Sequence, residues 1–424
     1  MTHSPCRSVL AFTFACALAT CAAAWGADWP QYRGPKSDAH SFEPGIAKSW
    51  PEGGPRVLWK VPVGEGFGTF AVRGERAYLF MDRGGKETAV AMDAGNGNEI
   101  WAVPLDQSIT DNQGGSNPRS TPTIDGDNVY FFTVNLKLVC LSAQDGRRKW
   151  ELDIKRDYRG QNLKWGNAAS PVLDGDRIYV AGGERGSSMM AVDKNTGRPI
   201  WAVGNETITH ASPVPATIHG VRQAIFFMKD GLVSLDSRSG KELWRYKFPF
   251  NVSTAASPVV GGENGDVVYC SAGYDVGAAA IQVRKEGDSF SAAQIWRTPG
   301  ANMNHWSTPL YHQGHLYGIF GFRDYSKGPG TGAPLKCVDI MTGKEKWSQP
   351  GFGSGGGTIF VDGMLLALGD GGLLTLVEAT PEGYREKGRV QLPGEKFWAA
   401  AIVANGKIYA RSKNEAFCLD ASGK

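Results

Sequence analysis

Residues 191–201 read Ala-Val-Asp-Lys-Asn-Thr-Gly-Arg-Pro-Ile-Trp, and residues 234–244 read Ser-Leu-Asp-Ser-Arg-Ser-Gly-Lys-Glu-Leu-Trp. In both segments a Gly follows an Asp by four residues, and a Trp follows that Gly by four more. Two further copies have the same spacing, Asp93–Gly97–Trp101 and Asp339–Gly343–Trp347. Self-similarity at intervals of several tens of residues indicates stacked copies of one supersecondary unit. We therefore expect a repeat protein.

Each copy contains four short predicted strands. A Ser-Pro or Thr-Pro pair opens the first strand, as at Ser170–Pro171 and Thr308–Pro309, and a Tyr or Phe marks the second. The third strand ends at the Asp, and the fourth carries the Trp. The Asp-to-Gly spacing is typical of a type I turn that ends in a Gly at positive φ, with the Asp side chain accepting bonds from backbone amides. Four antiparallel strands are the content of one propeller blade.

The two ends of the chain complement each other. Residues 57–61 form a last strand that no first three strands precede, whereas residues 398–420 supply three strands without a fourth. Pairing them closes a ring and removes its exposed edges. The sequence therefore predicts an all-β fold, an eight-bladed β-propeller of four-stranded antiparallel blades at residues 57–424. Its seventh blade spans residues 357–392, where Arg389–Val390 stands in place of a Trp strand.

Two segments precede the ring. Residues 1–27 have the features of a signal peptide, with a basic start at Arg7, an apolar run, and small residues at 22–24. The apolar run is short for a membrane span, so we expect an exported, periplasmic protein without one. Lipidation at Cys21 is an alternative for this segment. Residues 28–56, rich in Pro and Gly, are expected to form an N-terminal extension that packs on the propeller.

The cysteines beyond the signal segment are not expected to pair. Cys140, Cys337 and Cys418 occupy one slot of the repeat, two residues before the turn, which Ala or Ser fills in other copies. Such a slot requires a small buried side chain, and free Cys serves as one. Because these copies are not neighbours in the repeat order, the sequence predicts free thiols.

The charge of the chain gives no sign of a nucleic acid or membrane partner. Its 424 residues include 45 basic and 42 acidic side chains, which leaves a formal net charge of +3. Proteins that bind polyanions usually carry a clustered excess of Lys and Arg. We expect a monomer that binds no nucleic acid.

The segments at 191–201 and 234–244 resemble the pyrroloquinoline-quinone-type repeat. Residues 57–424 are accordingly similar to eight-bladed propellers of the quinoprotein-like superfamily. Residues 28–35, Asp-Trp-Pro-Gln-Tyr-Arg-Gly-Pro, resemble the start of a group of exported bacterial members. The superfamily includes quinone-dependent dehydrogenases and a non-catalytic scaffold of the outer-membrane barrel-assembly machinery. The resemblance implies the fold, whereas a function has to be argued from the site.

Resemblance to the dehydrogenases implies pyrroloquinoline quinone (PQQ) beside adjacent cysteines, and calcium held by Glu, Asn and Asp. This sequence has no Cys-Cys pair, and only Glu184 resembles the Glu of that calcium site. It also has no Cys-x-x-Cys-His motif for a c-type haem. The leading hypothesis is therefore a non-catalytic binding or scaffold protein of the periplasm or cell envelope, with no catalytic residue and no metal. The alternative is a PQQ- and calcium-dependent alcohol or sugar dehydrogenase with an atypical site.

Candidate site residues lie just before the first strand of each copy, because these loops converge on one mouth of the channel. They are Asn117, Arg119, Lys164, Trp165, Asn167, His210, Asn304, His305, Trp306, Lys396 and Trp398. Aromatic and cationic side chains without matching carboxylates suit a small anionic or aromatic ligand, or a protein partner. The same tryptophans also suit a sugar. The plainer interpretation is that the tryptophans cap the channel and the basic residues are solvated.

Overall fold

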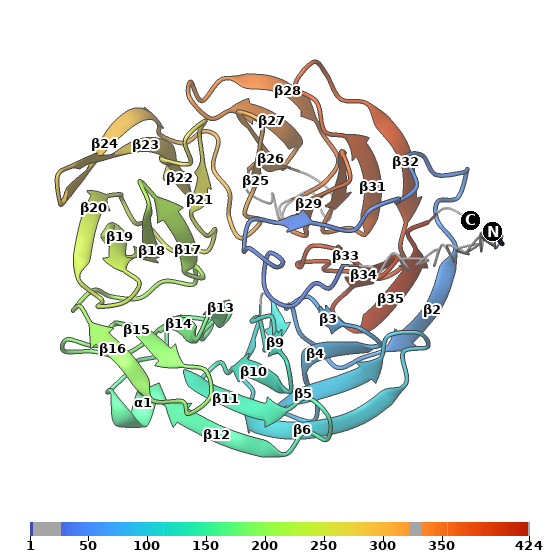
Figure 1. The fold of residues 1–424 in the computed structure, drawn as a ribbon, viewed down its shortest axis with the longest axis horizontal. Helices are drawn as coiled ribbons and strands as arrows, with labels where there is room; N and C mark the ends of the chain where they lie inside the picture. Colours follow the sequence, from blue (N-terminus) through green and yellow to red (C-terminus); the bar gives the residue numbers. More distant parts are fainter. Residues whose placement is uncertain (3–26, 113, 322–331, 354, 423–424) are drawn as a thin grey trace.

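The chain folds into a closed ring of eight sheets around a central channel (Figure 1). The computed structural model describes residues 1–2, 27–112, 114–321, 332–353 and 355–422. Almost all regular structure is strand, and the one helix among the described residues is α1 (Ile154–Asp157). The predicted all-β, eight-bladed propeller is confirmed.

Six blades follow one another along the chain with four antiparallel strands each. Blades 1 to 3 are β3 (Ala71–Arg73), β4 (Arg76–Asp82), β5 (Lys86–Asp93), β6 (Glu99–Gln107); β9 (Thr123–Asp125), β10 (Asn128–Phe132), β11 (Lys137–Ser142), β12 (Arg148–Asp153); and β13 (Val172–Asp174), β14 (Arg177–Ala181), β15 (Met189–Asp193), β16 (Pro199–Val203). Blades 4 to 6 are β17 (Val214–Ile218), β18 (Val221–Met228), β19 (Gly231–Asp236), β20 (Glu242–Lys247); β21 (Val259–Gly261), β22 (Val267–Ala272), β23 (Gly277–Glu286), β24 (Ser289–Thr298); and β25 (Leu310–His312), β26 (His315–Ile319), β27 (Leu335–Asp339), β28 (Glu345–Gln349). The first strand of each blade borders the channel (Figure 1).

The last two blades draw on both ends of the chain. Blade 7 is β29 (Gly357–Val361), β30 (Met364–Leu368), β31 (Leu373–Glu378) and β32 (Glu386–Gln391), and β1 (His40–Ser41) pairs in parallel with β29 as a fifth strand. Blade 8 is β33 (Ile402–Ala404), β34 (Lys407–Arg411), β35 (Glu415–Asp420) and β2 (Val57–Pro62). A small hairpin of β7 (Thr110–Asp111) and β8 (Gly115–Ser116) interrupts the connection from blade 1 to blade 2.

The ring closes as predicted, because β2 pairs antiparallel with β35 and places Trp59 opposite Cys418. A buried cation reinforces the junction. Arg411, only 2% exposed, donates to the backbone carbonyl oxygens of Phe80 (3.1 Å) and Gly64 (2.9 Å). These bonds tie blade 8 to blade 1 and to the chain that links β2 with it.

The Asp–Gly turns have the predicted geometry. The Asp193 Oδ1 atom accepts from the backbone N–H groups of Asn195 (3.1 Å) and Thr196 (2.8 Å). Gly197 then closes the turn at φ 72°, a conformation that favours glycine. The bulge that this turn introduces sets the Trp of the next strand opposite the small residue two positions before the Asp, as in the pair Ala191–Trp201.

Six of the seven repeated tryptophans dock on the turn of the following blade. The Trp150 indole N–H donates to the Lys194 carbonyl oxygen (3.1 Å), and its ring covers Gly197. The equivalent N–H bonds are Trp59 to Ala94, Trp101 to Ala143, Trp201 to Ser237, Trp296 to Ile340 and Trp347 to Thr380. Trp244 differs and donates to Gln223 in its own blade (2.8 Å). The repeat is therefore a blade-to-blade latch.

Blade 7 obtains its tryptophan from outside the repeat. In the register of β31 and β32, Gly388 lies opposite Leu376 and thus takes the Trp position. Trp50 of the N-terminal extension packs there, since a Cβ on Gly388 would lie 2.6 Å from the Trp50 Cβ, and the Trp50 N–H donates to the Lys387 carbonyl (2.8 Å). The sequence correctly marked this blade as lacking a repeated Trp, but it gave no sign of the substitute.

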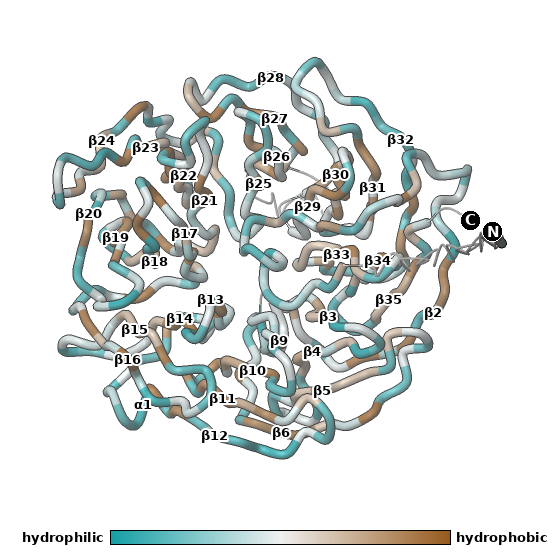
Figure 2. Tube along the Cα trace, viewed as in Figure 1, coloured by the Kyte–Doolittle hydropathy of each residue, from teal (hydrophilic) through white to brown (hydrophobic). Residues whose placement is uncertain are grey.

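The core lies between blades. Inner strands are almost completely buried, whereas hydrophilic residues predominate on the outer loops (Figure 2). All four cysteines of the described residues, Cys140, Cys270, Cys337 and Cys418, are free and buried, as predicted.

The N-terminal extension crosses the channel (Figure 1). Trp29 pairs with Val72 of β3, and the Ile124 N–H of β9 donates to Pro30 (2.8 Å). On the far side of the channel, the Phe360 N–H of β29 donates to Ala39 (2.9 Å). The segment therefore spans the ring and does more than cover its outer surface.

Residues 3–26, which contain Cys21 and most of the predicted signal peptide, lie outside the described residues. Within the part of the chain that the structure describes, no helix has the length and apolar character needed to cross a membrane.

Candidate functional site

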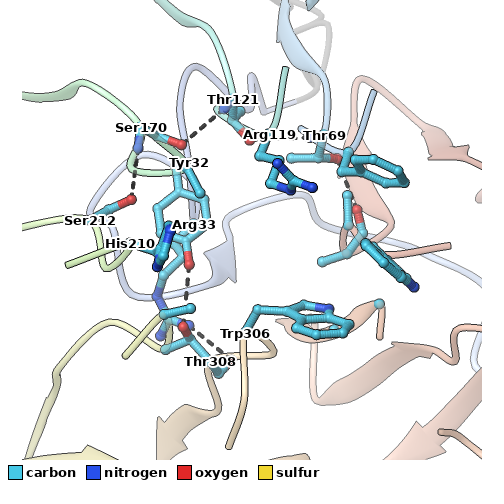
Figure 3. Close-up of a pocket in the computed structure, with 18 of the residues that line it drawn as sticks. Tyr32, Arg33, Thr69, Arg119, Thr121, Ser170, His210, Ser212, Trp306 and Thr308 are labelled. Carbon is cyan, nitrogen blue, oxygen red and sulfur yellow. Dashed lines mark hydrogen bonds between the residues drawn. The ribbon is translucent and has the colours of Figure 1, made fainter. Parts of the chain in front are cut away.

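A cavity occupies the channel between the mouth loops and the N-terminal extension (Figure 3). Of the predicted site residues, the structure brings six to its wall: Arg119, Trp165, His210, His305, Trp306 and Trp398. They come from five different blades because each precedes a first strand at the same end of the ring. These six residues belong to the loops that differ from blade to blade.

The floor of the cavity is formed by residues that the sequence reasoning missed. Tyr32 and Arg33 of the extension line it. The Tyr32 hydroxyl lies 3.2 Å from the Thr308 Oγ1 atom. The Arg33 guanidinium donates to the carbonyl oxygens of Thr308 (3.1 Å) and Pro309 (2.9 Å). Residues 28–35 resemble the start of other family members, but nothing in that motif indicates that Tyr32 and Arg33 contact the channel.

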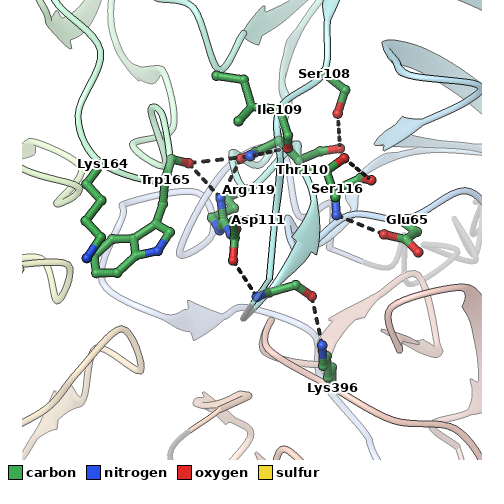
Figure 4. A network of polar contacts seen from close by, with 12 residues as sticks. Glu65, Ser108, Ile109, Thr110, Asp111, Ser116, Arg119, Lys164, Trp165 and Lys396 are labelled. Atoms are coloured by element: carbon green, nitrogen blue, oxygen red, sulfur yellow. Dashed lines mark hydrogen bonds and ion pairs between the residues drawn. The ribbon is translucent and has the colours of Figure 1, made fainter.

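Polar contacts at the mouth centre on Arg119 (Figure 4). Its guanidinium forms an ion pair with Asp111 in the β7–β8 hairpin and donates to the Trp165 carbonyl oxygen (2.7 Å). Lys396 donates to the Gly114 carbonyl in the same hairpin (3.0 Å). These bonds fix the hairpin over the channel. Asp111 is the one carboxylate among the described residues that line the cavity, and its charge is matched by Arg119.

An arc of aromatic rings forms one side of the cavity. Ring centroids lie 4.7 Å apart for Phe67 and Trp398, 4.8 Å for Trp398 and Trp306, and 4.2 Å for Trp306 and His305. Tyr274 continues the arc by meeting His305 edge-on at 4.9 Å. Phe67 and Tyr274 were missed because neither stands directly before a Ser-Pro or Thr-Pro pair.

Two lysines stand over tryptophan rings at the mouth. The Lys164 Nζ atom lies 4.7 Å from the Trp165 ring centroid, and the Lys396 Nζ atom lies 5.8 Å from that of Trp398. Lys164 is exposed and makes no ion pair with any described residue. A cation beside an aromatic face attracts anionic and planar groups at once.

The two histidines of the wall are neutral at neutral pH. Burial lowers the pKa of His210 to about 4. Burial, together with the nearby His210, lowers the pKa of His305 to about 3. His210 donates through Nε2 to the Lys164 carbonyl oxygen (2.9 Å), since a carbonyl can only accept, and Nδ1 accepts from the Ser253 hydroxyl (2.9 Å). Both nitrogens of His210 are thus engaged in holding the wall.

The three predicted asparagines lie behind the wall. Asn117, Asn167 and Asn304 are almost fully buried. Asn117 donates to the Ile109 carbonyl (2.9 Å), and Asn304 accepts from the Tyr269 hydroxyl (2.6 Å). Buried amides that are bonded to backbone and side chains position loops, so these residues shape the mouth and do not line it.

The residues do not fit the calcium site implied by the dehydrogenase resemblance. Glu184 follows β14 in a turn, where its N–H donates to the Tyr158 carbonyl (2.9 Å), and it is not among the residues that line the cavity. Among the described residues, no group of three or more His, Cys, Asp or Glu side chains gathers closely enough to hold a metal ion.

Comparison with known proteins gives the family. A family model described as "Outer membrane protein assembly factor BamB" matches residues 52–202 and again residues 161–318, together more than half of the chain. The chain belongs to the BamB family. No curated protein matches it in sequence.

Solved structures resemble this member of the BamB family in fold. BamB from Moraxella catarrhalis is 14% identical, with a TM-score of 0.59 over 86% of this chain and 97% of that one. Quinohemoprotein alcohol dehydrogenase from Comamonas testosteroni is 13% identical, with a TM-score of 0.64 over 94% and 81%. The computationally designed Ika8 protein is 10% identical, with a TM-score of 0.58 over 86% and 99%. At these identities the likeness shows the fold alone.

Proposed function

We propose that this protein is an exported, monomeric, non-catalytic binding or scaffold propeller of the periplasm or cell envelope. Its binding site is the channel cavity. The observation that carries this proposal is the convergence of aromatic and cationic side chains from separate blades on one cavity, which the N-terminal extension closes from below. A rigid concave site with aromatic walls and a few polar groups is the usual form of a ligand pocket.

The polar groups around the cavity bond to one another and to the backbone, and so they stabilise the cavity wall. Arg119 is paired with Asp111, and both nitrogens of His210 are engaged by neighbours. A general acid or base needs a pKa near the working pH and a free path for its proton. The low pKa of His210 and its two bonds suit a structural role, which favours binding over catalysis.

The alternative, a PQQ-dependent alcohol or sugar dehydrogenase, draws its support from the family likeness and from Lys164, whose exposed ammonium would meet a quinone carboxylate. PQQ supplies hydride acceptance in such enzymes when bound. In this chain Arg119 and Lys164 would contact its carboxylates, and the neighbouring tryptophan rings would lie against its plane. Because the residues do not fit calcium, we favour the binding function.

Thermal denaturation with small-molecule probes tests the proposal. Wild-type protein is heated with benzoate, glucose or PQQ, and the same probes are added to Trp306→Leu. We expect at least one probe to raise the Tm of the wild type in a saturable way, since a ligand that binds only the folded state stabilises it. The increase should be lost in Trp306→Leu, whose indole N–H has no partner among the described residues. The absence of a Tm increase with every probe would contradict a small-molecule site in the channel.

A further inference from the structure

A belt of hydroxyl side chains encircles the channel at the start of the first strands. Six blades carry Ser or Thr two residues before the strand core: Thr69, Thr121, Ser170, Ser212, Ser257 and Thr308. In four cases the hydroxyl oxygen accepts a hydrogen bond from the backbone N–H of the equivalent residue one blade earlier. The pairs, with the N–H donor first, are Thr69 and Thr121 (3.1 Å), Thr121 and Ser170 (2.9 Å), Ser170 and Ser212 (2.9 Å), and Ser257 and Thr308 (2.9 Å). The Ser-Pro and Thr-Pro motifs therefore link blades.

Three consecutive members of the belt, Thr121, Ser170 and Ser212, form an arc on one wall of the cavity (Figure 3). They are only 3%, 2% and 3% exposed. Each accepts one backbone N–H, yet none of the three hydroxyls donates to any described protein atom. The arc thus presents three donor hydrogens that no described protein acceptor uses.

Of the other three belt members, Thr69 and Thr308 have further partners, whereas the Ser257 hydroxyl has no partner among the described residues and lies outside the cavity lining. The Thr69 hydroxyl donates to the Ala400 carbonyl oxygen (2.9 Å), and the Thr308 hydroxyl bonds with Tyr32. A buried donor left without an acceptor is destabilising, because it loses its hydrogen bonds to water. Unmatched donors side by side on a cavity wall therefore indicate an acceptor inside the cavity, and the best acceptor for several O–H groups is an anion.

A buried positive charge lines the same cavity, next to Thr308 of the belt. Arg33 lines the cavity floor at 7% exposure and forms no ion pair with a described carboxylate. Its N–H groups donate to backbone carbonyl oxygens, so the guanidinium would attract a ligand through its positive electrostatic potential and not through a direct hydrogen bond. A cation in a poorly solvated site attracts an anion strongly because water screens it little.

Trp306 faces the arc across the cavity (Figure 3). Its ring packs between His305 and Trp398 and lines the cavity wall. A broad apolar face opposite a set of hydrogen-bond donors selects a ligand with one flat apolar side and one acidic end.

We propose that the channel binds a small carboxylate that carries a flat ring, with the carboxylate on the arc of Thr121, Ser170 and Ser212 above Arg33 and the ring against Trp306. This assignment rests on the proposed binding function of the cavity and names its ligand class. It places the acidic end deep in the channel, below the lysines of the mouth.

Benzoate and its neutral counterpart benzamide test the assignment on the full chain. Tryptophan fluorescence and calorimetry follow each titration, because Trp306 lies in the site. We expect saturable binding of benzoate and at least tenfold weaker binding of benzamide, since hydrogen bonds to a charged group are about twice as strong as neutral ones. Equal affinity for the two probes, or tighter binding of glucose, would overturn the carboxylate assignment while leaving the cavity a binding site. Failure of every probe to bind would instead contradict the proposed function.

Variants locate the carboxylate. Thr121→Val preserves the side-chain shape but removes the hydroxyl, and it should weaken benzoate binding at least threefold. The double variant Ser170→Ala/Ser212→Ala removes two hydroxyls and should weaken benzoate binding at least tenfold. The matched control is Ser257→Ala, which removes a belt hydroxyl that neither lines the cavity nor bonds to any described residue; it should bind benzoate as the wild type does. Circular dichroism verifies folding. If the double variant does not fold, Thr121→Val and Trp306→Leu decide, and unchanged affinity in both would overturn the proposal.

Discussion

At the scale of single residues, the latch between blades depends on a Trp and a Gly that belong to different repeats. Gly197 is at φ 72°, and a Cβ placed on it would lie 2.5 Å from the Trp150 ring. Two requirements therefore meet at this position, a left-handed backbone and space for the indole. A second Gly, Gly220, meets only the first requirement, because its φ is 76° and nothing lies within 4 Å of its Cβ position.

Alanine at these two glycines separates the two requirements. Gly220→Ala should lower the free energy of unfolding by about 1–2 kcal/mol, the cost of a left-handed non-glycine residue. Gly197→Ala should cost about 1–3 kcal/mol more, because it also forces the indole of Trp150 out of its place. Chemical denaturation measures both. Equal losses would show that the indole contact contributes little.

Buried Glu87 couples stability to pH. It is fully buried, its Oε2 atom accepts the Val134 N–H (2.8 Å), and its Oε1 atom has no partner among the described residues. Burial raises the pKa of this carboxyl well above its usual range, and Asp106 and Asp82 raise it further. Because the pKa is raised in the folded state, the stability that Glu87 contributes is fully present below its unfolded pKa, near 4.3, and is lost as the pH rises toward the folded pKa.

Glu87→Gln removes this titration while preserving the acceptor for Val134. We expect the variant to gain stability relative to the wild type as the pH rises from 4 to 8, with little difference at pH 4. Denaturant titrations at a series of pH values measure the two curves. A difference that is constant with pH would show that Glu87 does not titrate between the folded and unfolded states.

At the scale of elements, the N-terminal extension does three things. It adds β1 to blade 7, it supplies Trp50 at the position where blade 7 has Gly388 in place of a repeated Trp, and it forms the cavity floor.

Trp50→Ala should lower the free energy of unfolding by about 3–5 kcal/mol, as for other buried aromatic residues. Phe42→Ala is the control in the same segment, because Phe42 is 54% exposed, and it should change stability by less than about 0.5 kcal/mol. Hydrogen exchange in β32 should rise only in Trp50→Ala; unchanged exchange there would contradict its docking on blade 7.

The blades, their turns and the pairing of β2 with β35 were predictable because they repeat, and repetition makes the pattern visible in one sequence. The role of the extension was not predictable, since its contacts occur once and involve residues far away along the chain. Trp50 and Arg33 carry no local pattern that names their partners. The hydroxyl belt was visible as Ser-Pro and Thr-Pro pairs, but proline's limits in a sheet explained those pairs without any role for the hydroxyl.

At the scale of the whole molecule, one set of residues stabilises the ring and another set lines the cavity. Asp–Gly turns and tryptophans hold the ring together, and most of these tryptophans are buried between blades. The cavity is lined by residues outside this pattern, which come from the mouth loops, the extension and the hydroxyl belt. Substitution of a cavity residue such as Trp306 should therefore change ligand binding while the latches between blades remain in place.

The central claim is that the cavity binds a ligand and performs no oxidation. The most direct measurement is the reduction of an artificial electron acceptor by the full protein after incubation with PQQ and calcium, with ethanol or glucose as substrate. We predict no rate above that of heat-denatured protein, under conditions where benzoate binding remains saturable. Turnover of either substrate that is lost in Glu184→Gln would contradict the account and establish a quinone-dependent dehydrogenase.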